Sequence, residues 1–118
     1  MIQTNLYTVL TSDASLSAKI GSRVYPLVAP QNPVCPYIIY LRVSKKDTAD
    51  INGVSSLDAG RFQIDIWAKS YKESVEIAKL VEATLSGKAE LINQMDDYDG
   101  EVKLYRQICE YLIFEGDI

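Results

Sequence analysis

Residues 61–69 place side chains of different character on the two sides of an extended chain, and this pattern constrains the fold more than any other segment. The apolar side carries Phe62, Ile64, Ile66 and Ala68. The other side carries Arg61, Gln63, Asp65, Trp67 and Lys69. Since successive side chains of a strand point to opposite faces, the alternation predicts a half-buried β-strand. Such a strand needs neighbouring strands and a second layer over its apolar face.

A second strand is predicted over 37–43, where β-branched and aromatic residues follow a proline-rich segment. The chain's 4 prolines all lie between Pro26 and Pro36, which predicts a stiff surface connection. Because Pro26 restricts the residue before it, 23–25 is expected to be extended. The small and polar residues of 44–60 predict a long loop that joins the two strands into a hairpin. Loops longer than about 12–15 residues in compact domains are usually functional or disordered.

Helices are predicted at the N-terminus and after the alternating strand. Apolar residues at helical spacing mark the first part of the chain as helical, with an end at Gly21. Ser70 and Glu73 have the spacing of a capping box, in which each side chain bonds the other's backbone N–H. The helix that they begin is predicted over 71–86 and is expected to end at Gly87.

The last third of the chain gives weaker signals. Residues 89–95 fit either a short strand or a loose turn, and 96–100 are predicted as a turn. Apolar side chains in 102–114 recur every four residues, as on a helix, yet the Tyr, Ile, Val and Phe content favours a strand. Together these elements predict a single α+β domain over 1–118. Its mostly antiparallel sheet of about four strands has helices packed on one face, in the order α-β-β-β-α-β.

Composition disfavours several classes of function. The 118 residues include 16 acidic and 12 basic ones, a net charge of −4, whereas proteins that bind nucleic-acid phosphates usually have a basic excess. No apolar run approaches the roughly 20 residues of a membrane helix, and the start lacks the basic region of a signal peptide. A soluble, cytoplasmic chain is therefore expected.

The residue inventory also argues against an enzyme. The chain has no histidine, and its 2 cysteines lie far apart, which removes the commonest general acid–base residue and most zinc sites. The acidic segment 96–101 lacks the ligand spacing of a calcium loop. Helix capping explains Ser70 and Glu73 without a hydrolytic role. No catalytic residue, cofactor or metal ion is expected.

Aromatic residues on the polar side of the alternating strand are the candidate functional feature. Trp67 lies there beside charged and amide side chains, and the chain has 8 tyrosines against 2 phenylalanines. Tyr, Trp and Arg are enriched at protein interfaces, although a second layer of this same chain is the alternative cover for such a face. The predicted contact residues are Tyr40, Arg42, Arg61, Gln63, Asp65 and Trp67, with the loop residues Ile51, Val54 and Leu57.

Four segments, taken in order, carry a resemblance to a known family. They are residues 21–32, residues 36–40, the strand 61–68 followed by Ser70 and Tyr71, and a late group made of 98–99, 104–106 and a closing strand to Glu115. In this order they resemble the tail-completion or tail-terminator proteins of long-tailed bacteriophages, over nearly the whole chain. Trp67 departs from the pattern, because a smaller or different aromatic residue is usual there.

The resemblance implies a structural role. Such proteins are added to the end of a finished tail tube as a hexameric ring, which stops tube growth and offers a surface to the head connector. The implied partners are further copies of the chain, the tail tube protein and the head-connector or stopper protein, with no membrane partner and with DNA only passing through the lumen. The implied location is the virion tail, and the host cytoplasm during assembly. The alternative is a small α+β regulatory or ligand-binding module without catalytic activity.

Overall fold

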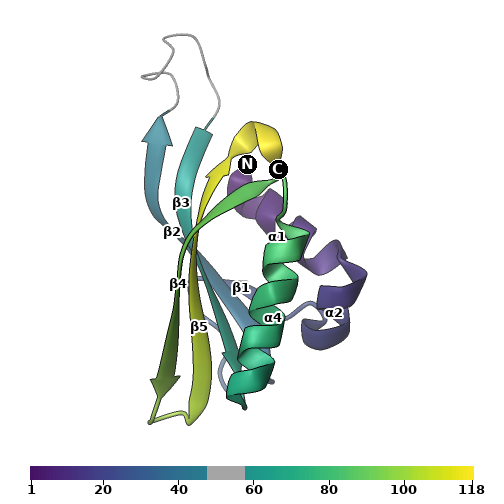
Figure 1. Cartoon of the computed structure of the whole chain (residues 1–118), viewed down its shortest axis with the longest axis vertical. Coiled ribbons are helices and arrows are strands. Elements are labelled where there is room, and N and C mark those ends of the chain that lie inside the picture. Colours follow the sequence, from purple (N-terminus) through teal and green to yellow (C-terminus); the bar gives the residue numbers. More distant parts are fainter. Residues whose placement is uncertain (48–57) are drawn as a thin grey trace.

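A five-stranded sheet with helices on one face forms the protein in the computed structural model, which describes residues 1–47 and 58–118 (Figure 1). The sheet order is β1-β2-β3-β5-β4. The helices are α1 (Ile2–Ser12), α2 (Ala14–Ile20) and α4 (Tyr71–Thr84), and a short 3₁₀ helix, η1 (Glu115–Asp117), closes the chain. The strands are β1 (Val24–Pro26), β2 (Tyr37–Asp47), β3 (Asp58–Ala68), β4 (Ala89–Asp99) and β5 (Leu104–Phe114).

The predicted α+β class is confirmed, but the predicted sheet was wrong in two respects. The sheet has five strands rather than four, and the element order is α-α-β-β-β-α-β-β. It is also mixed rather than mostly antiparallel, because β1 pairs with β2 in parallel while the other three pairings are antiparallel.

The extra strand is β4, which includes the residues predicted as an acidic turn. The strand continues through Asp99, and the turn follows at 100–103. There the Asp99 side chain accepts hydrogen bonds from the backbone N–H groups of Glu101 and Val102, at 2.9 and 3.3 Å. β4 is an outer strand with most side chains exposed, so acidic residues carry little burial cost in it. The strand favoured over 102–114 is confirmed as β5.

The hairpin of β2 and β3 is confirmed, with longer strands than predicted. The ladder runs to the pair Asp47 and Asp58, so both ends of the predicted 44–60 loop belong to strands. A bulge between Arg42 and Ser44 shifts the register within this ladder. The candidate residues Ile51, Val54 and Leu57 lie outside the described residues.

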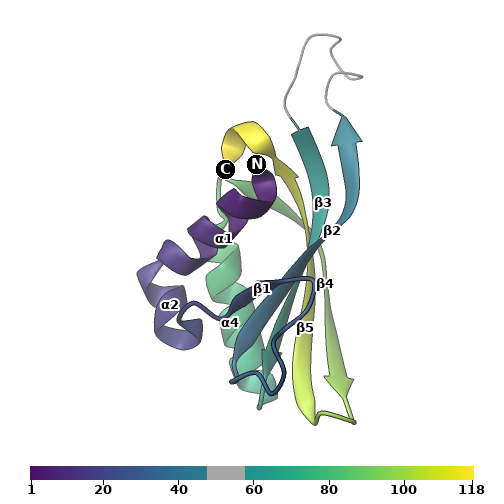
Figure 2. The same ribbon diagram turned by 180° about the vertical axis from the view of Figure 1, so that it is seen from behind.

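The core lies between the sheet and the three helices, which cover one face in both views (Figures 1 and 2). As the alternation predicted, Phe62, Ile64, Ile66 and Ala68 are fully buried. Phe62, Ile64 and Ile66 pack in one cluster with apolar residues from the helices and from β5. The helical members are Ile2, Leu6, Leu10, Leu16, Ile20, Ile77, Ala78 and Val81, and Leu85, which directly follows α4, joins them.

Local side-chain chemistry fixes where the helices begin and end. Gly21 follows α2 with a φ of 57°, as predicted for a residue that ends a helix. The Ser70 hydroxyl accepts the Glu73 backbone N–H at 3.1 Å, which confirms Ser70 as the N-cap of α4. The helix ends at Thr84, two residues earlier than predicted.

Replacing the cap tests this assignment. Ser70→Ala removes the acceptor for one N–H at the start of α4, and we expect it to cost about 1 kcal/mol of folding free energy. Thermal unfolding is the measurement, with an expected fall of a few degrees in Tm. Ser86→Ala is the matched control, because Ser86 is exposed beyond the end of the helix. Equal melting temperatures for the two variants would refute the capping role.

Candidate functional site

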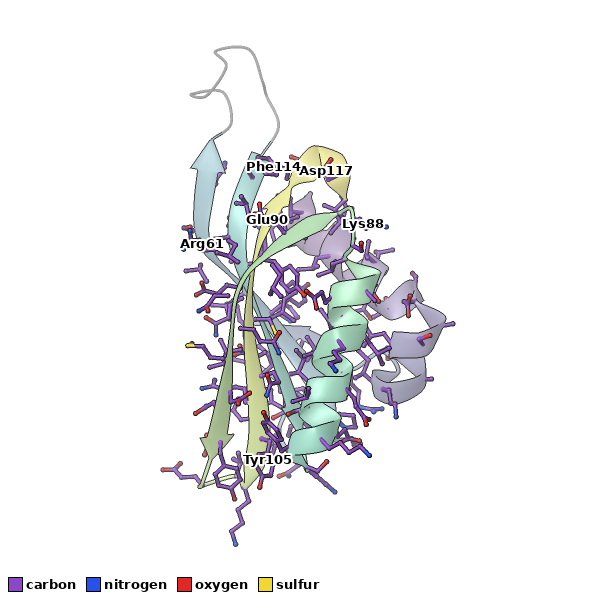
Figure 3. All side chains as sticks on the ribbon, viewed as in Figure 1. Arg61, Lys88, Glu90, Tyr105, Phe114 and Asp117 are labelled. Atoms are coloured by element: carbon purple, nitrogen blue, oxygen red, sulfur yellow. The ribbon has the colours of Figure 1, made fainter. Side chains whose placement is uncertain are left out.

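The face of the sheet opposite the helices is the candidate functional site. The odd-numbered residues 61–67 of β3 point to this side, and neither ribbon view shows a helix over it (Figures 1 and 2). Arg61, labelled in Figure 3, projects away from the helices. We call this surface the open face. Strand register assigns further members to it, because directly paired residues of neighbouring strands point the same way.

A row of aromatic and charged side chains crosses all five strands on the open face. Tyr25 of β1 lies against Tyr37 of β2, with ring centroids 6.3 Å apart. Tyr37 stacks on Trp67 of β3 at 6.2 Å, with an angle of 17° between the ring planes. The Arg106 guanidinium of β5 lies 4.8 Å from the centroid of the Trp67 ring. We call Tyr25, Tyr37, Trp67, Arg106 and Asp97 the cross-strand row.

Asp97 of β4 completes the row. Its Oδ2 accepts the Nε–H of Arg106 at 2.9 Å and also accepts from Nη2. Arg106 is therefore held from two sides, by an aromatic ring and by a carboxylate. Charge-assisted bonds and cation–π contacts are each stronger than neutral surface contacts, so the row has a defined geometry before any partner binds.

Asp65 is a buried carboxylate on this surface, with 5% of its surface accessible, and Tyr37 is similarly buried at 6%. Gln63 Nε2 donates to both of its oxygens, at 3.0 and 3.2 Å, and Arg106 Nη1 lies 3.6 Å from Oδ2. Burial raises the pKa of Asp65 above its ordinary value, and these two partners offset that effect only in part.

The structure divides the predicted contact residues between two faces. Arg61, Gln63, Asp65 and Trp67 share the open face, where Arg61 is exposed and Trp67 is half-buried. Tyr40 instead faces the helices, is 6% exposed, and donates from its hydroxyl to the Gln3 carbonyl at 3.1 Å.

Arg42 lies on the helix side too, because it pairs with the buried Phe62. It is exposed at the margin of the core. Simple alternation along 37–43 does not reveal the side on which Tyr40 and Arg42 lie, because that depends on their pairing with β3.

Sequence reasoning missed four members of the cross-strand row: Tyr25, Tyr37, Asp97 and Arg106. Each lies on a different strand from Trp67, and only the register brings them together. Arg106 lies in one of the segments that carried the family resemblance. The sequence did not show to which side its side chain points, because 102–114 fitted either a helix or a strand. Asp97 was assigned to a turn.

The described residues hold two cysteines as further reactive side chains. Both cysteines are free thiols, and burial raises the pKa of Cys109 to about 12, which keeps it protonated and unreactive at neutral pH. In residues 1–47 and 58–118 there is no cluster of three or more potential metal ligands. None of the helices described is long and apolar enough to cross a membrane.

The raised pKa of Asp65 predicts that the stability of the fold depends on pH. A raised pKa means that folding disfavours the ionised carboxylate, so this residue weakens the fold as pH rises through its pKa. Asp65→Asn removes the charge at every pH. We therefore expect the Tm of the variant, relative to the parent chain, to rise between pH 3 and pH 7. Asp117→Asn removes an equal charge from an exposed position and controls for net charge. A relative Tm that falls over this range would mean that the Arg106 ion pair outweighs burial.

Comparisons with known proteins agree with this fold. One chain in a structure described as the virion of a native gene transfer agent particle matches with a TM-score of 0.75 at 17% sequence identity. The match covers 92% of this chain and 90% of the other, and it shows that the two share a fold. The comparison with curated protein sequences gives no match.

A family model carries the assignment further. The model described as "Tail completion protein gp17" matches residues 4–115, which is nearly the whole chain. This confirms the family resemblance seen in the order of the sequence segments. The family consists of structural proteins of the bacteriophage tail. The chain therefore belongs to the tail completion protein gp17 family.

Proposed function

We propose that the protein forms a ring on the end of the tail tube and serves there as part of the head–tail joining interface. In this proposal the open face contacts a neighbouring copy or the tail tube protein. The head-connector or stopper protein is a further partner on the finished tail. The proposed locations are the virion tail and, during assembly, the host cytoplasm.

The cross-strand row is the observation that carries this proposal. Tyr, Trp and Arg are the residues that most often dominate binding energy at interfaces. Here they lie on a sheet face that none of the described helices covers, and contacts within the chain already fix their positions. A surface ordered in advance loses less side-chain entropy on binding, so the same contacts give a higher affinity.

The charge of the chain is consistent with a position around passing DNA. A net charge of −4 gives no general attraction for phosphates, and a tight grip on DNA would slow its transit. The proposal therefore assigns the protein no sequence-specific or phosphate-specific DNA contact.

Truncating the tryptophan tests the proposal. Trp67→Ala removes the ring that stacks between Tyr37 and Arg106. We expect a folded protein, less stable by about 1–3 kcal/mol, because Trp67 lies outside the apolar core. Loss of a central interface aromatic costs about 2 kcal/mol or more of association, and a ring repeats that loss at each contact. Electron microscopy of particles made with the mutant gene should show unjoined heads or tails of abnormal length.

Two further variants separate assembly from stability. Arg61→Glu changes an exposed side chain that has no hydrogen bond or ion pair to the described residues, so we expect an unchanged Tm together with the assembly defect. Tyr7→Ala truncates a partly exposed aromatic on α1, on the other side of the molecule, and should assemble normally. Normal particles from both open-face variants would remove the open face from the interface.

A further inference from the structure

The sheet ends in two unlike edges. On one side β4 is the outermost strand, 11 residues long, and it exposes the apolar side chains of Ile92, Met95 and Tyr98 at 42%, 47% and 51%. On the other side β1 covers β2 only at Ile38–Tyr40. From Leu41 onward, β2 has no strand on its outer side among the described residues.

The two edges carry opposite charge. β4 contains Glu90, Asp96, Asp97 and Asp99 and no basic residue. Among the residues of β2 whose side chains the structure describes, 37–45, Arg42 and Lys45 are basic and none is acidic. Like charges placed opposite each other on paired strands are destabilising, and opposite charges stabilise the pair. Two copies therefore repel each other β4 to β4, but attract each other β4 to β2.

The β2 edge also offers an apolar recess. A surface hollow of about 270 Å³ beside this edge is lined by Gln3, Pro26, Leu27, Tyr40, Leu41 and Arg42. Next to it Leu27 and Val28 are 70% and 76% exposed. Exposed apolar side chains at one edge and an apolar hollow at the other are complementary, and both gain from being removed from water.

Strand direction fits the same arrangement. β2 is antiparallel to β3, β3 to β5, and β5 to β4, so β4 runs antiparallel to β2 within one copy. A second copy in the same orientation therefore presents its β2 antiparallel to the β4 of the first. Contacts of this head-to-tail kind generate rings when the rotation closes.

We propose that the outer edge of β4 pairs with the outer edge of β2, beyond Tyr40, in the next copy of this chain, so that the sheet continues from subunit to subunit. This inference rests on the ring proposed above and names the contact that builds it. The acidic edge, the basic edge and the apolar hollow together select a second copy as the partner.

A complementation experiment tests this contact. The β4-edge variant is Ile92→Lys with Met95→Lys, and the β2-edge variant is Arg42→Glu with Val43→Glu; all four side chains are exposed. Each variant blocks one edge and leaves the other intact. Sedimentation velocity of the full chain over a wide concentration range, free and with tail tubes, measures assembly. The matched control is Lys79→Glu with Ala83→Lys, two exposed positions of α4, the helix that packs on β3 and β5.

Head-to-tail pairing predicts a specific pattern. Each edge variant alone stays monomeric, with a dissociation constant for self-association raised by roughly tenfold or more. Mixing the two restores association, since an intact β2 edge meets an intact β4 edge, and the lysines of one variant face the glutamates of the other. The control assembles like the parent chain.

The other possible outcomes distinguish a failure of the edge pairing from a failure of the ring proposal. Rings that persist in either variant, or a mixture that does not associate, overturn the edge pairing and leave the ring itself standing. A parent chain that associates neither free nor on tail tubes overturns the ring proposal together with this contact.

Discussion

The two-sided character of β3 is the constraint on which the rest of the structure depends. β3 lies at the centre of the sheet and is paired along its length with β2 and β5. Its apolar side chains, fully buried at positions such as Ile64 and Ile66, require the helical layer. The same pleat sends Asp65 and Trp67 to the opposite face. The apolar side of β3 thus forms part of the core, and its other side is free of the helices and can contact a partner.

The open face shows how a surface can be ordered without a second layer. A Trp on a bare sheet would expose a large apolar ring, and a lone Arg would sample many rotamers. Here each limits the other, because Arg106 lies over the Trp67 ring and is itself held by Asp97. The order comes from contacts across strands, so it depends on the register of four strand pairings rather than on any one segment.

The parts of this structure that the sequence predicts are those set by local patterns. The alternation of 61–69, the Ser70 cap and Gly21 each depend on residues close together in the chain, and each was predicted correctly. Residues 89–95 were left open between strand and turn, and 96–99 was wrongly predicted as a turn, because this end of an outer strand is largely exposed and three of its four residues are acidic. The cross-strand row was missed for a different reason. Arg106 and Trp67 meet only through long-range register, which no window of neighbouring residues contains.

The short parallel strand β1 has a consequence for how chains can slide past each other. Because β1 occupies β2 at Ile38–Tyr40, any strand added to that edge meets a physical stop at Tyr40. Sheet edges are otherwise prone to slip, since backbone hydrogen bonds repeat every two residues and do not distinguish one register from the next. In this fold β1 blocks an added strand from extending past Tyr40 and so fixes its register along β2. The same register at every contact would give identical copies the same offset from one subunit to the next.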